Sequence, residues 1–389
     1  MNYGKLTRVR WQAVKNAPLN LAIASFLFFA CHKSNVDQKD LRDFEQVNLV
    51  ANSEEYHPRT IDQTLINAFG ISWSPNGIAW VNSVGGHLSE LYSAEGDTLR
   101  RVGIPSPTDN TGGLPCGIVF SGSQGFNLPN GPSAFLFTGF DGILSGWNPA
   151  SGNNAQRLRN PPGASYTGLA IGSSGGQNFI YAANFGQKKI DVWDTAFRKI
   201  SMPFKDPELP DEFSPYNIQA IGNQLFVMYA ELSTSGPTAG HGVAGQGKGF
   251  VSVFNTDGSF VKRFTSKGTL NVPWGITMTP GSFMEDKDFF NDFQTQAKNN
   301  ASGDDHTHIS KDPVILVGNF GDGHINVFSQ DGIFLGQLQS HRQPIVIDGL
   351  WALSFPPGTA TPAIDPGRLY FTAGPEHESD GIFGYLIRK

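Results

Sequence analysis

Cysteine and charge are both scarce in this chain. It has two cysteines, Cys31 and Cys116, and 16% of its residues are charged, against roughly 25% in an average soluble protein. The net charge is −6 and no Lys/Arg cluster appears after the N-terminal segment, which argues against nucleic-acid binding. The nucleophile elbow, the HExxH motif and the CxxC motif are also absent, so no common catalytic signature indicates a reaction.

Phenylalanine, glycine and proline are abundant instead. The 389 residues include 30 Phe, and 39% of the chain is hydrophobic, which is ample for a large core. The 46 Gly and 25 Pro fit a fold of many short strands joined by many turns. A chain of this length can hold two average domains or one large all-β domain.

The N-terminal segment has the layout of an export signal. It carries basic residues and no acidic one ahead of the apolar run from Leu19 to Ala30, whose length of about twelve residues is too short to span a membrane. The run ends at Ala30-Cys31, and a polar stretch follows. The segment resembles a bacterial lipoprotein signal peptide, although Phe28 stands where that family usually has an aliphatic residue. An ordinary secretory signal with an incidental cysteine is the alternative.

The resemblance implies that residues 1–30 are removed and that Cys31 is lipidated. Two acyl chains would hold the protein stably on a membrane, with residues 31–43 as a flexible tether. A disulfide between the two cysteines is then poorly supported, and we expect Cys116 to be an unpaired, buried thiol. Under either interpretation the protein is exported.

Internal repeats are the strongest signal in the sequence. A short phrase that usually ends in Gly-Ile or Gly-Leu recurs at residues 67–71, 114–118, 165–169, 214–218, 272–276 and 348–353. Each phrase is followed by a unit that is clearest at residues 313–334, where runs of β-branched and aromatic residues alternate with Gly/Asn/Asp turns. The spacing of about 40 to 70 residues predicts an all-β, six-bladed β-propeller of four-stranded antiparallel blades. Glycine in the phrase suits inner strands that crowd near the axis.

The sixth repeat ends at Lys389, one strand short, and Phe44 to Ala51 has strand character. We expect this N-terminal strand to complete the last blade and so to close the ring. The propeller therefore covers residues 44–389.

Several phrases resemble an uncharacterised family of exported bacterial β-propellers. They include QVNLVAN at residues 46–52, YAANFGQKKIDVWD at 181–194 and ILVGNFGDGHINVF at 315–328. Some members of that family carry a C-terminal PEP-CTERM sorting segment, which this chain lacks, and the family has no established activity to transfer. The chain also resembles, more distantly, the NHL-type six-bladed propellers. That group includes binding proteins, lactonases and an amidating lyase.

The loops between the second and third strands are the predicted ligand-binding region, because they gather on one face around the channel. Polar residues recur there, namely Asn82, Asp141, Asn184, Glu231, Asn319, Asp322 and, within Glu376-His377-Glu378, His377. Asn and Asp at such places either satisfy their own turns or turn their oxygens toward the axis and hold a cation such as Ca²⁺. The structural interpretation is the default.

Two insertions interrupt the repeats. Residues 232–249 are glycine-rich, lie on the channel face, and are either a simple flexible loop or a flap that brings His241 over a ligand. Residues 280–312 begin with a capping box, Ser282 and Glu285, and predict a short helix on the rim. The polar tail of this insertion is expected to be solvated, with a transition-metal site as the alternative; its potential ligands are Asp304, Asp305, His306 and His308.

Two functions are compatible with these features. The leading hypothesis is an exported, lipid-anchored binding or scaffolding module of the bacterial cell envelope, with the membrane as one partner. Its other partner is an envelope protein, a glycan or a small molecule, and not nucleic acid. The alternative is a metal-dependent hydrolase or lyase of the lactonase-like propeller type.

Overall fold

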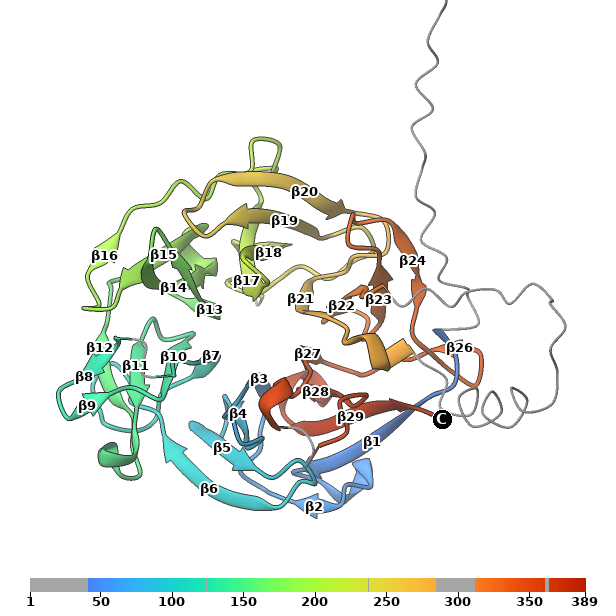
Figure 1. Ribbon diagram of the computed structural model, residues 1–389, viewed down its shortest axis with the longest axis horizontal. Coiled ribbons are helices and arrows are strands. Elements are labelled where there is room, and N and C mark those ends of the chain that lie inside the picture. Colours follow the sequence, from blue (N-terminus) through green and yellow to red (C-terminus); the bar gives the residue numbers. More distant parts are fainter. Residues whose placement is uncertain (1–40, 123–124, 237, 285–311, 361–363) are drawn as a thin grey trace, which may run out of the picture. The chain divides into compact units, whose positions relative to one another are not determined.

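A computed structural model describes residues 41–122, 125–236, 238–284, 312–360 and 364–389. The chain forms two compact units, and all described residues belong to the second, Ser34–Lys389. Within that unit, six antiparallel blades of four strands each surround a common axis (Figure 1). The predicted fold class and blade count are confirmed.

Each blade runs outward from its innermost strand. Blades 1 to 3 consist of β3 (Ala68–Trp73), β4 (Ala79–Ser83), β5 (Leu88–Tyr92) and β6 (Thr98–Gly103); β7 (Pro115–Phe120), β10 (Phe135–Gly139), β11 (Leu144–Trp147) and β12 (Gln156–Arg159); and β13 (Tyr166–Ser174), β14 (Gln177–Asn184), β15 (Lys189–Asp194) and β16 (Lys199–Ile200). Blades 4 to 6 consist of β17 (Phe213–Ile221), β18 (Gln224–Glu231), β19 (Phe250–Asn255) and β20 (Phe260–Ser266); β21 (Pro273–Met278), β22 (Ile315–Asn319), β23 (Ile325–Phe328) and β24 (Phe334–Gln337); and β27 (Leu350–Ser354), β28 (Leu369–Ala373), β29 (Ile382–Arg388) and β1 (Phe44–Ala51).

The remaining elements are short. They are the strands β2 (Thr60–Ile61), β8 (Asn127–Leu128), β9 (Gly131–Pro132), β25 (Gln339–Ser340) and β26 (Gln343–Pro344), the 3-10 turns η2 (Glu54–Tyr56), η3 (Pro149–Ser151), η4 (Phe185–Gln187), η5 (Gly281–Met284) and η6 (Gly358–Ala360), and α2 (Pro375–Glu378). In the part of the chain that is described, no helix has the length and apolar character needed to cross a membrane.

Second strands are the most deeply buried, because each blade packs a face against both of its neighbours. Every residue of β4, β10, β22 and β28 is buried. Between blades 1 and 2, the rings of Trp80 and Phe135 stack with their centroids 4.0 Å apart, and Trp147 lies 4.9 Å from Trp80. The abundant aromatic residues thus form the interfaces between blades, where large rings contribute most of the buried apolar area.

The N-terminal strand closes the ring. β1 pairs antiparallel with β29, from Phe44 opposite Arg388 to Ala51 opposite Ile382, so the predicted closing strand is confirmed. β2 adds two residues in parallel to the outer edge of β1. Phe44 is buried and its ring stacks on Phe283 at 5.1 Å, which fixes the start of β1 to the described part of the second insertion.

Each innermost strand is interrupted at the recurring phrase. The pairing between first and second strands shifts between Ala68 and Ile71 in blade 1, and equivalent shifts fall in the phrases of the other five blades. Such β-bulges leave a residue unpaired and redirect its side chain. The redirected side chains, Phe69 and Trp351 among them, meet in one buried cluster.

Glycine in the phrase is required by close approach between blades. A Cβ on Gly117 would lie 2.7 Å from the amide nitrogen of Leu169 in the next blade, and one on Gly275 would lie 2.5 Å from the carbonyl oxygen of Trp351. Real Cβ atoms do not approach backbone atoms so closely. The predicted crowding near the axis is therefore present.

A buried ionic network ties the outer part of blade 1 together. The Glu90 side chain is fully buried, and its Oε1 accepts a hydrogen bond of 2.6 Å from Thr64 Oγ1. Arg101 Nε lies 3.0 Å from Glu90 Oε2, but Oε2 lacks a hydrogen bond of good geometry. Burial raises the pKa of Glu90 to about 7, with the neighbouring Asp62 adding to the rise and Arg101 opposing it.

Several predictions lie outside the described residues. They are the signal peptide at residues 1–30, the lipidation site Cys31, the start of the tether, residue 285 of the capping box, the rim helix and the polar tail with its possible metal ligands. Cys116 is described, and it is buried and free.

Candidate functional site

The two ends of the ring differ, and one of them gathers all the predicted loops. In every blade the start of the innermost strand pairs with the end of the second strand, as Ala68 pairs with Ser83 and Pro273 with Asn319. The loops that leave the second strands therefore lie at the same end of the channel as the recurring phrases. We call this end the channel mouth.

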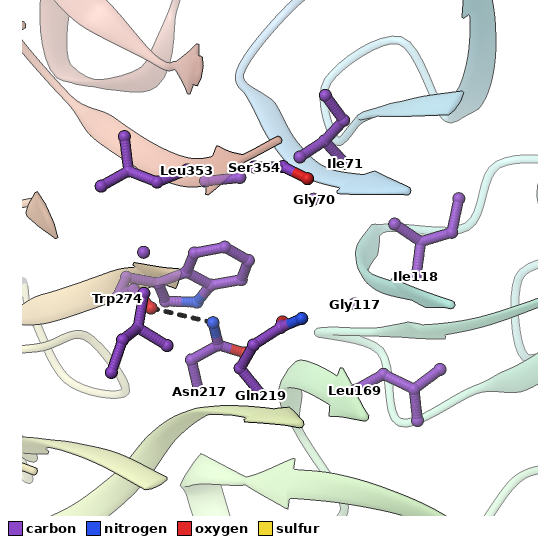
Figure 2. Close-up of a pocket in the computed structure, with 13 residues that line it drawn as sticks. Gly70, Ile71, Gly117, Ile118, Leu169, Asn217, Gln219, Trp274, Leu353 and Ser354 are labelled. Atoms are coloured by element: carbon purple, nitrogen blue, oxygen red, sulfur yellow. Dashed lines mark hydrogen bonds between the residues drawn. The ribbon is translucent and has the colours of Figure 1, made fainter. Parts of the chain in front are cut away.

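The channel below the mouth is narrow. Its cavity measures about 30 Å³ and is lined by innermost strands from all six blades (Figure 2). Asn217 replaces glycine in the phrase of blade 4, and its Nδ2 donates a 2.8 Å hydrogen bond to the carbonyl oxygen of Trp274 in the next blade (Figure 2). Space of this size holds one or two water molecules. An organic ligand therefore does not fit within this channel cavity.

An apolar cluster drawn from all six blades fills the axis at the mouth. Trp351 lies at its centre, with its ring stacked on Phe69 at 3.8 Å and on Phe320 at 4.0 Å. Trp274 meets Phe69 edge-on at 5.0 Å. The buried members of this cluster, which we call the aromatic floor, are Phe69, Val84, Cys116, Phe185, Tyr216, Ala230, Val272, Trp274, Trp351 and Ala352.

The bulges explain why these side chains meet. Phe69, Tyr216, Trp274 and Trp351 each stand directly before the Gly-Ile position of their phrase, inside the register shift of their strand. Cys116 occupies the same place in blade 2. A regular strand would turn such residues into the interface between blades, whereas the bulge turns them toward the axis.

Glu378 places a carboxylate beside this floor. Its Oε2 accepts a 2.7 Å hydrogen bond from Asn67 Nδ2, and Asn67 Oδ1 accepts a 2.8 Å bond from Trp351 Nε1. Glu378 is half-buried. Burial raises the pKa of its carboxyl, while the nearby charge of His241 and the Asn67 hydrogen bond lower it. The carboxylate is thus linked through one amide to the central ring of the floor.

The turn that carries Glu378 has an unusual backbone. Glu376, His377 and Glu378 have φ angles of 52°, 56° and 69°, and left-handed conformations of this kind cost non-glycine residues on the order of 1 kcal/mol each. The turn is held by a 3.1 Å hydrogen bond from the Glu376 amide to Asp348 Oδ2. Strain that the surroundings enforce is common at functional sites.

The first insertion brings a histidine to the mouth. Two backbone hydrogen bonds of 2.9 Å fix the base of this insertion. The Val243 amide donates to the carbonyl of Glu231, the last residue of β18, and the Ser233 amide donates to the His241 carbonyl. Gly242 lies against the floor, since a Cβ there would be 2.9 Å from Val272 Cγ1. His241 is exposed and lies close enough to Glu378 for its charge to lower the pKa of that carboxyl.

The predicted asparagines connect blades and loops. Asn82 Nδ2 donates to the carbonyl oxygens of Cys116 and Gly117 in the next blade, at 3.2 and 3.3 Å. Asn184 caps η4, where its Oδ1 accepts the Gln187 amide at 3.2 Å. Asn319 Nδ2 donates to the Thr269 carbonyl at 2.7 Å. The Oδ1 atoms of Asn82 and Asn319 are buried without a partner among the described residues, a position that bound water commonly satisfies.

The predicted acidic residues are mostly held by their own loops. Asp141 accepts the amides of Leu114 at 3.2 Å and of Ile143 at 3.3 Å, and burial raises the pKa of its carboxyl. Glu231 forms a 2.9 Å ion pair with Lys248. Within the described part of the chain, one pair of these predicted residues is joined by a side-chain hydrogen bond. Asn319 Nδ2 donates to Asp322 Oδ1 at 3.0 Å. His377 is exposed on the strained turn.

These oxygens do not form a cation site that we can assign. Ca²⁺ takes six to eight oxygen ligands at one point, whereas these carboxylates are spread over different blades and paired with amides or lysine. In the described ranges no group of three or more His, Cys, Asp and Glu residues could hold a metal ion.

Comparison with known proteins finds uncharacterized viral relatives. No family model matches the chain. Uncharacterized protein L690 of Acanthamoeba polyphaga mimivirus is 34% identical over 236 residues, which cover 57% of this chain and 51% of that protein. Uncharacterized protein R648 of the same virus is 27% identical over 359 residues, covering 88% of this chain and 80% of that protein. The chain thus spans about half the length of L690.

Two solved structures resemble the chain at low identity. "Streptogramin B lyase structure" has a TM-score of 0.47 and 13% identity, and covers 88% of this chain and 96% of that one. The selenomethionine-substituted virginiamycin B lyase from Staphylococcus aureus has a TM-score of 0.43 and 14% identity, and covers 89% and 99%. At these scores neither similarity bears on the activity of this chain.

Proposed function

We propose that the protein is a ligand-binding propeller whose site is the channel mouth. The observation that carries this proposal is Glu378, a half-buried carboxylate on a strained turn, linked through Asn67 to the central ring of the aromatic floor. A stable propeller needs neither the strain nor the desolvated carboxylate. Both are typical of a site that is held ready for a ligand.

The chemistry of the mouth favours a small polar molecule with one apolar face. Leu114, Phe140, Leu232 and Phe320 are partly buried and pack against the floor, so they offer apolar surface around it. Aromatic and aliphatic side chains with a few polar groups are the usual composition of such sites. A sugar unit, free or part of a glycan, fits this description.

Replacing Glu378 by Gln is expected to weaken sugar binding at least about ten-fold, because a charge-assisted hydrogen bond contributes roughly twice as much as a neutral one. The measurement is a titration of the full chain with a set of monosaccharides and short oligosaccharides, followed by tryptophan fluorescence, since Trp351 and Trp274 lie in the floor. Glu376→Gln, an exposed change in the same turn, is the matched control and should leave the affinity unchanged. No response from any sugar, or equal affinities for the two variants, would contradict the proposed site.

An enzymatic role is the second candidate, and the raised pKa of the Glu378 carboxyl, on which the charge of His241 acts, is what favours it. A carboxyl of raised pKa can exchange protons with a substrate, as hydrolases and lyases require. Product formation from a bound sugar, lost in both Glu378→Gln and His241→Ala, would support this role. A stoichiometric divalent ion in the purified chain would favour the metal-dependent form.

We also propose that the protein is an exported lipoprotein anchored through Cys31. Support comes from the basic segment, the short apolar run and the cysteine that follows it. A variant with Cys31→Ala is expected to move from the membrane fraction to the soluble fraction of fractionated cells, because it cannot carry the acyl chains that hold the protein in place. Ser34→Ala, a neighbouring change, should stay on the membrane. Persistence of the Cys31 variant in the membrane fraction would sink the lipoprotein proposal.

A further inference from the structure

The segment that joins β2 to β3 is held by side chains at both of its ends. It consists of Asp62 to Asn67, which we call the entry segment, and it runs from the outer edge of blade 6 to the innermost strand of blade 1 (Figure 1). At its inner end, Asn67 donates a hydrogen bond to the carboxylate of Glu378. At its outer end, Asp62 and Thr64 belong to the buried ionic network around Glu90. The entry segment therefore connects that network with the channel mouth.

The Thr64 hydroxyl is shared by two carboxyl groups. Its Oγ1 lies 2.7 Å from Asp62 Oδ1 and 2.6 Å from Glu90 Oε1, and both distances are typical of hydrogen bonds. A hydroxyl has one proton to donate and two lone pairs that accept. Thr64 can therefore donate to one of the two carboxyl groups, and the other contact needs a proton on a carboxyl group. The two lone pairs can accept this proton and the Nε–H of Arg101, which lies 3.1 Å away.

Glu90 is the carboxyl group that is better suited to hold the extra proton. Asp62 has other donors in the Thr64 amide at 3.1 Å and in Arg101 Nη2 at 2.8 Å. Its Oδ2 also accepts a 3.1 Å hydrogen bond from the Tyr92 hydroxyl. Glu90 is fully buried, and its Oε2 lacks a hydrogen bond of good geometry. A buried carboxyl with few donors favours its neutral form, in agreement with the rise of its pKa to about 7.

Few charges surround Glu90. The charged and titratable groups that act on it are Asp62, Arg101 and Tyr92, and β4, which pairs with β5 on its inner side, has no titratable side chain. Tyr370 and Tyr385 of blade 6 lie in the same apolar cluster as Tyr92, and tyrosine hydroxyls stay neutral near pH 7. Ionised Glu90 would therefore share one hydroxyl proton and one guanidinium with Asp62. Because a buried charge without enough donors is costly, the entry segment must shift to relieve it.

We propose that the proton on Glu90 controls the channel mouth, which is ordered while Glu90 is neutral and loosens when Glu90 ionises. This inference rests on the proposed function of the mouth. The Thr64 carbonyl accepts a 2.6 Å hydrogen bond from Ser83 Oγ, and the same Oγ accepts the Ile66 amide at 2.9 Å. A shift of Thr64 is thus transmitted through the entry segment to Asn67, the residue that follows Ile66. The carboxylate at the mouth then loses the amide that positions it.

The fluorine NMR signal of Trp351 tests this proposal without a ligand, because the Trp351 indole donates to Asn67. In the full chain labelled with fluorotryptophan, the signal is assigned by its loss in Trp351→Phe. It should shift between pH 5 and pH 8 with a midpoint near pH 7. In Glu90→Gln it should stay at its pH 5 position throughout, because an amide can donate to Thr64 at every pH. Glu95→Gln, a change on the turn after β5, is the matched control and should follow the parent.

Other titrating groups are separated by two further variants. Histidine titrates in the same range, and Glu378 itself lies at the mouth, so Glu378→Gln and His241→Ala should both keep the transition. A Trp351 signal that does not move with pH, a transition that persists in Glu90→Gln, or one that either mouth variant abolishes would overturn the proposal.

Sugar affinity provides a second readout. At pH 8, Glu90→Gln should bind at least about five-fold more tightly than the parent, a typical coupling between two sites, whereas the two should agree at pH 5. Equal affinities at pH 8 would contradict control of the mouth by Glu90. Failure of every sugar to bind would count against the proposed function alone, because the fluorine signal needs no ligand.

Discussion

Replacing Trp351 by Ala should lower the free energy of unfolding by about 3–5 kcal/mol, the usual cost of truncating a buried large aromatic residue. Trp351 is 1% exposed and stacks on Phe69 and on Phe320. Its removal opens a cavity where all six blades meet, and the blades cannot collapse into it because their sheets are rigid. The change also removes the hydrogen bond that positions Asn67 beside Glu378.

Urea unfolding followed by circular dichroism measures this loss. Trp351→Phe is the matched control, because it keeps a ring in the stack and removes the indole N–H, and it should cost about 1–2 kcal/mol. It should nevertheless weaken ligand binding at the mouth, since Asn67 loses the donor that fixes its amide. A loss below about 1 kcal/mol for Trp351→Ala would show that the aromatic floor does not hold the blades together.

Replacing Glu90 by Gln should stabilise the protein at pH 8 by about 1–3 kcal/mol and have little effect at pH 5. The pKa of Glu90 is raised from 4.5 to about 7 in the folded protein, and a difference of one pKa unit corresponds to about 1.4 kcal/mol. Between pH 4.5 and pH 7 the folded state keeps a proton that the unfolded state releases. The free energy of unfolding therefore falls as the pH rises through this window.

The difference between the variant and the parent, measured by urea unfolding from pH 5 to pH 8, isolates Glu90 from all other titrating groups. Asp62→Asn is the control, because its expected effect on the free energy of unfolding has the opposite sign. Although burial raises its pKa, hydrogen bonds from Thr64 and Arg101 lower the pKa of Asp62 overall, so its charge stabilises the fold at neutral pH and its removal should destabilise. A Glu90→Gln variant that tracks the parent at every pH would show that Glu90 is charged in the folded state without penalty.

The fold could be predicted because its signal is repeated six times. Each copy carries the same order of strands and turns, so an ambiguous run in one blade is resolved by its counterparts. The closing strand could be predicted by counting. The sixth repeat contains only three strands, and the strand-like segment Phe44 to Ala51 lies outside all six repeats, so it could supply the fourth. Phrases that vary, such as Asn217 in place of glycine, did not hide the period.

The site was harder to predict, because it depends on the direction of single side chains. Asn82 and Asn319 stand at the ends of second strands, as expected, yet their amides bond to carbonyls of the backbone. The residues that do converge are in the bulges of the innermost strands. Their signal was present, since Phe69 and Trp351 both stand before the small residue of their phrase. A bulge is set by pairing between strands, which residue spacing alone does not reveal.

The position of Glu378 was also beyond prediction, because it too depends on the direction of a single side chain. The loop Glu376-His377-Glu378 was predicted to face the channel, with His377 as its ligand-binding residue. The structure leaves His377 exposed and half-buries Glu378, because three successive left-handed residues turn the chain back on itself. Glu, which occupies two of these three positions, is not a residue that sequence patterns associate with such a turn. The role of His377 in binding stays a prediction.

The pairing of β1 with β29 has a consequence for how the chain acquires its structure. The two strands lie more than three hundred positions apart, as in the pair Val47 and Tyr385, so their contact has a very high sequence separation. Proteins dominated by such contacts fold slowly, and here β1 cannot pair within the ring until β29 has been synthesised. Until then β1 is an unpaired edge, open to association with other chains. During that interval the exposed edge of β1 favours aggregation.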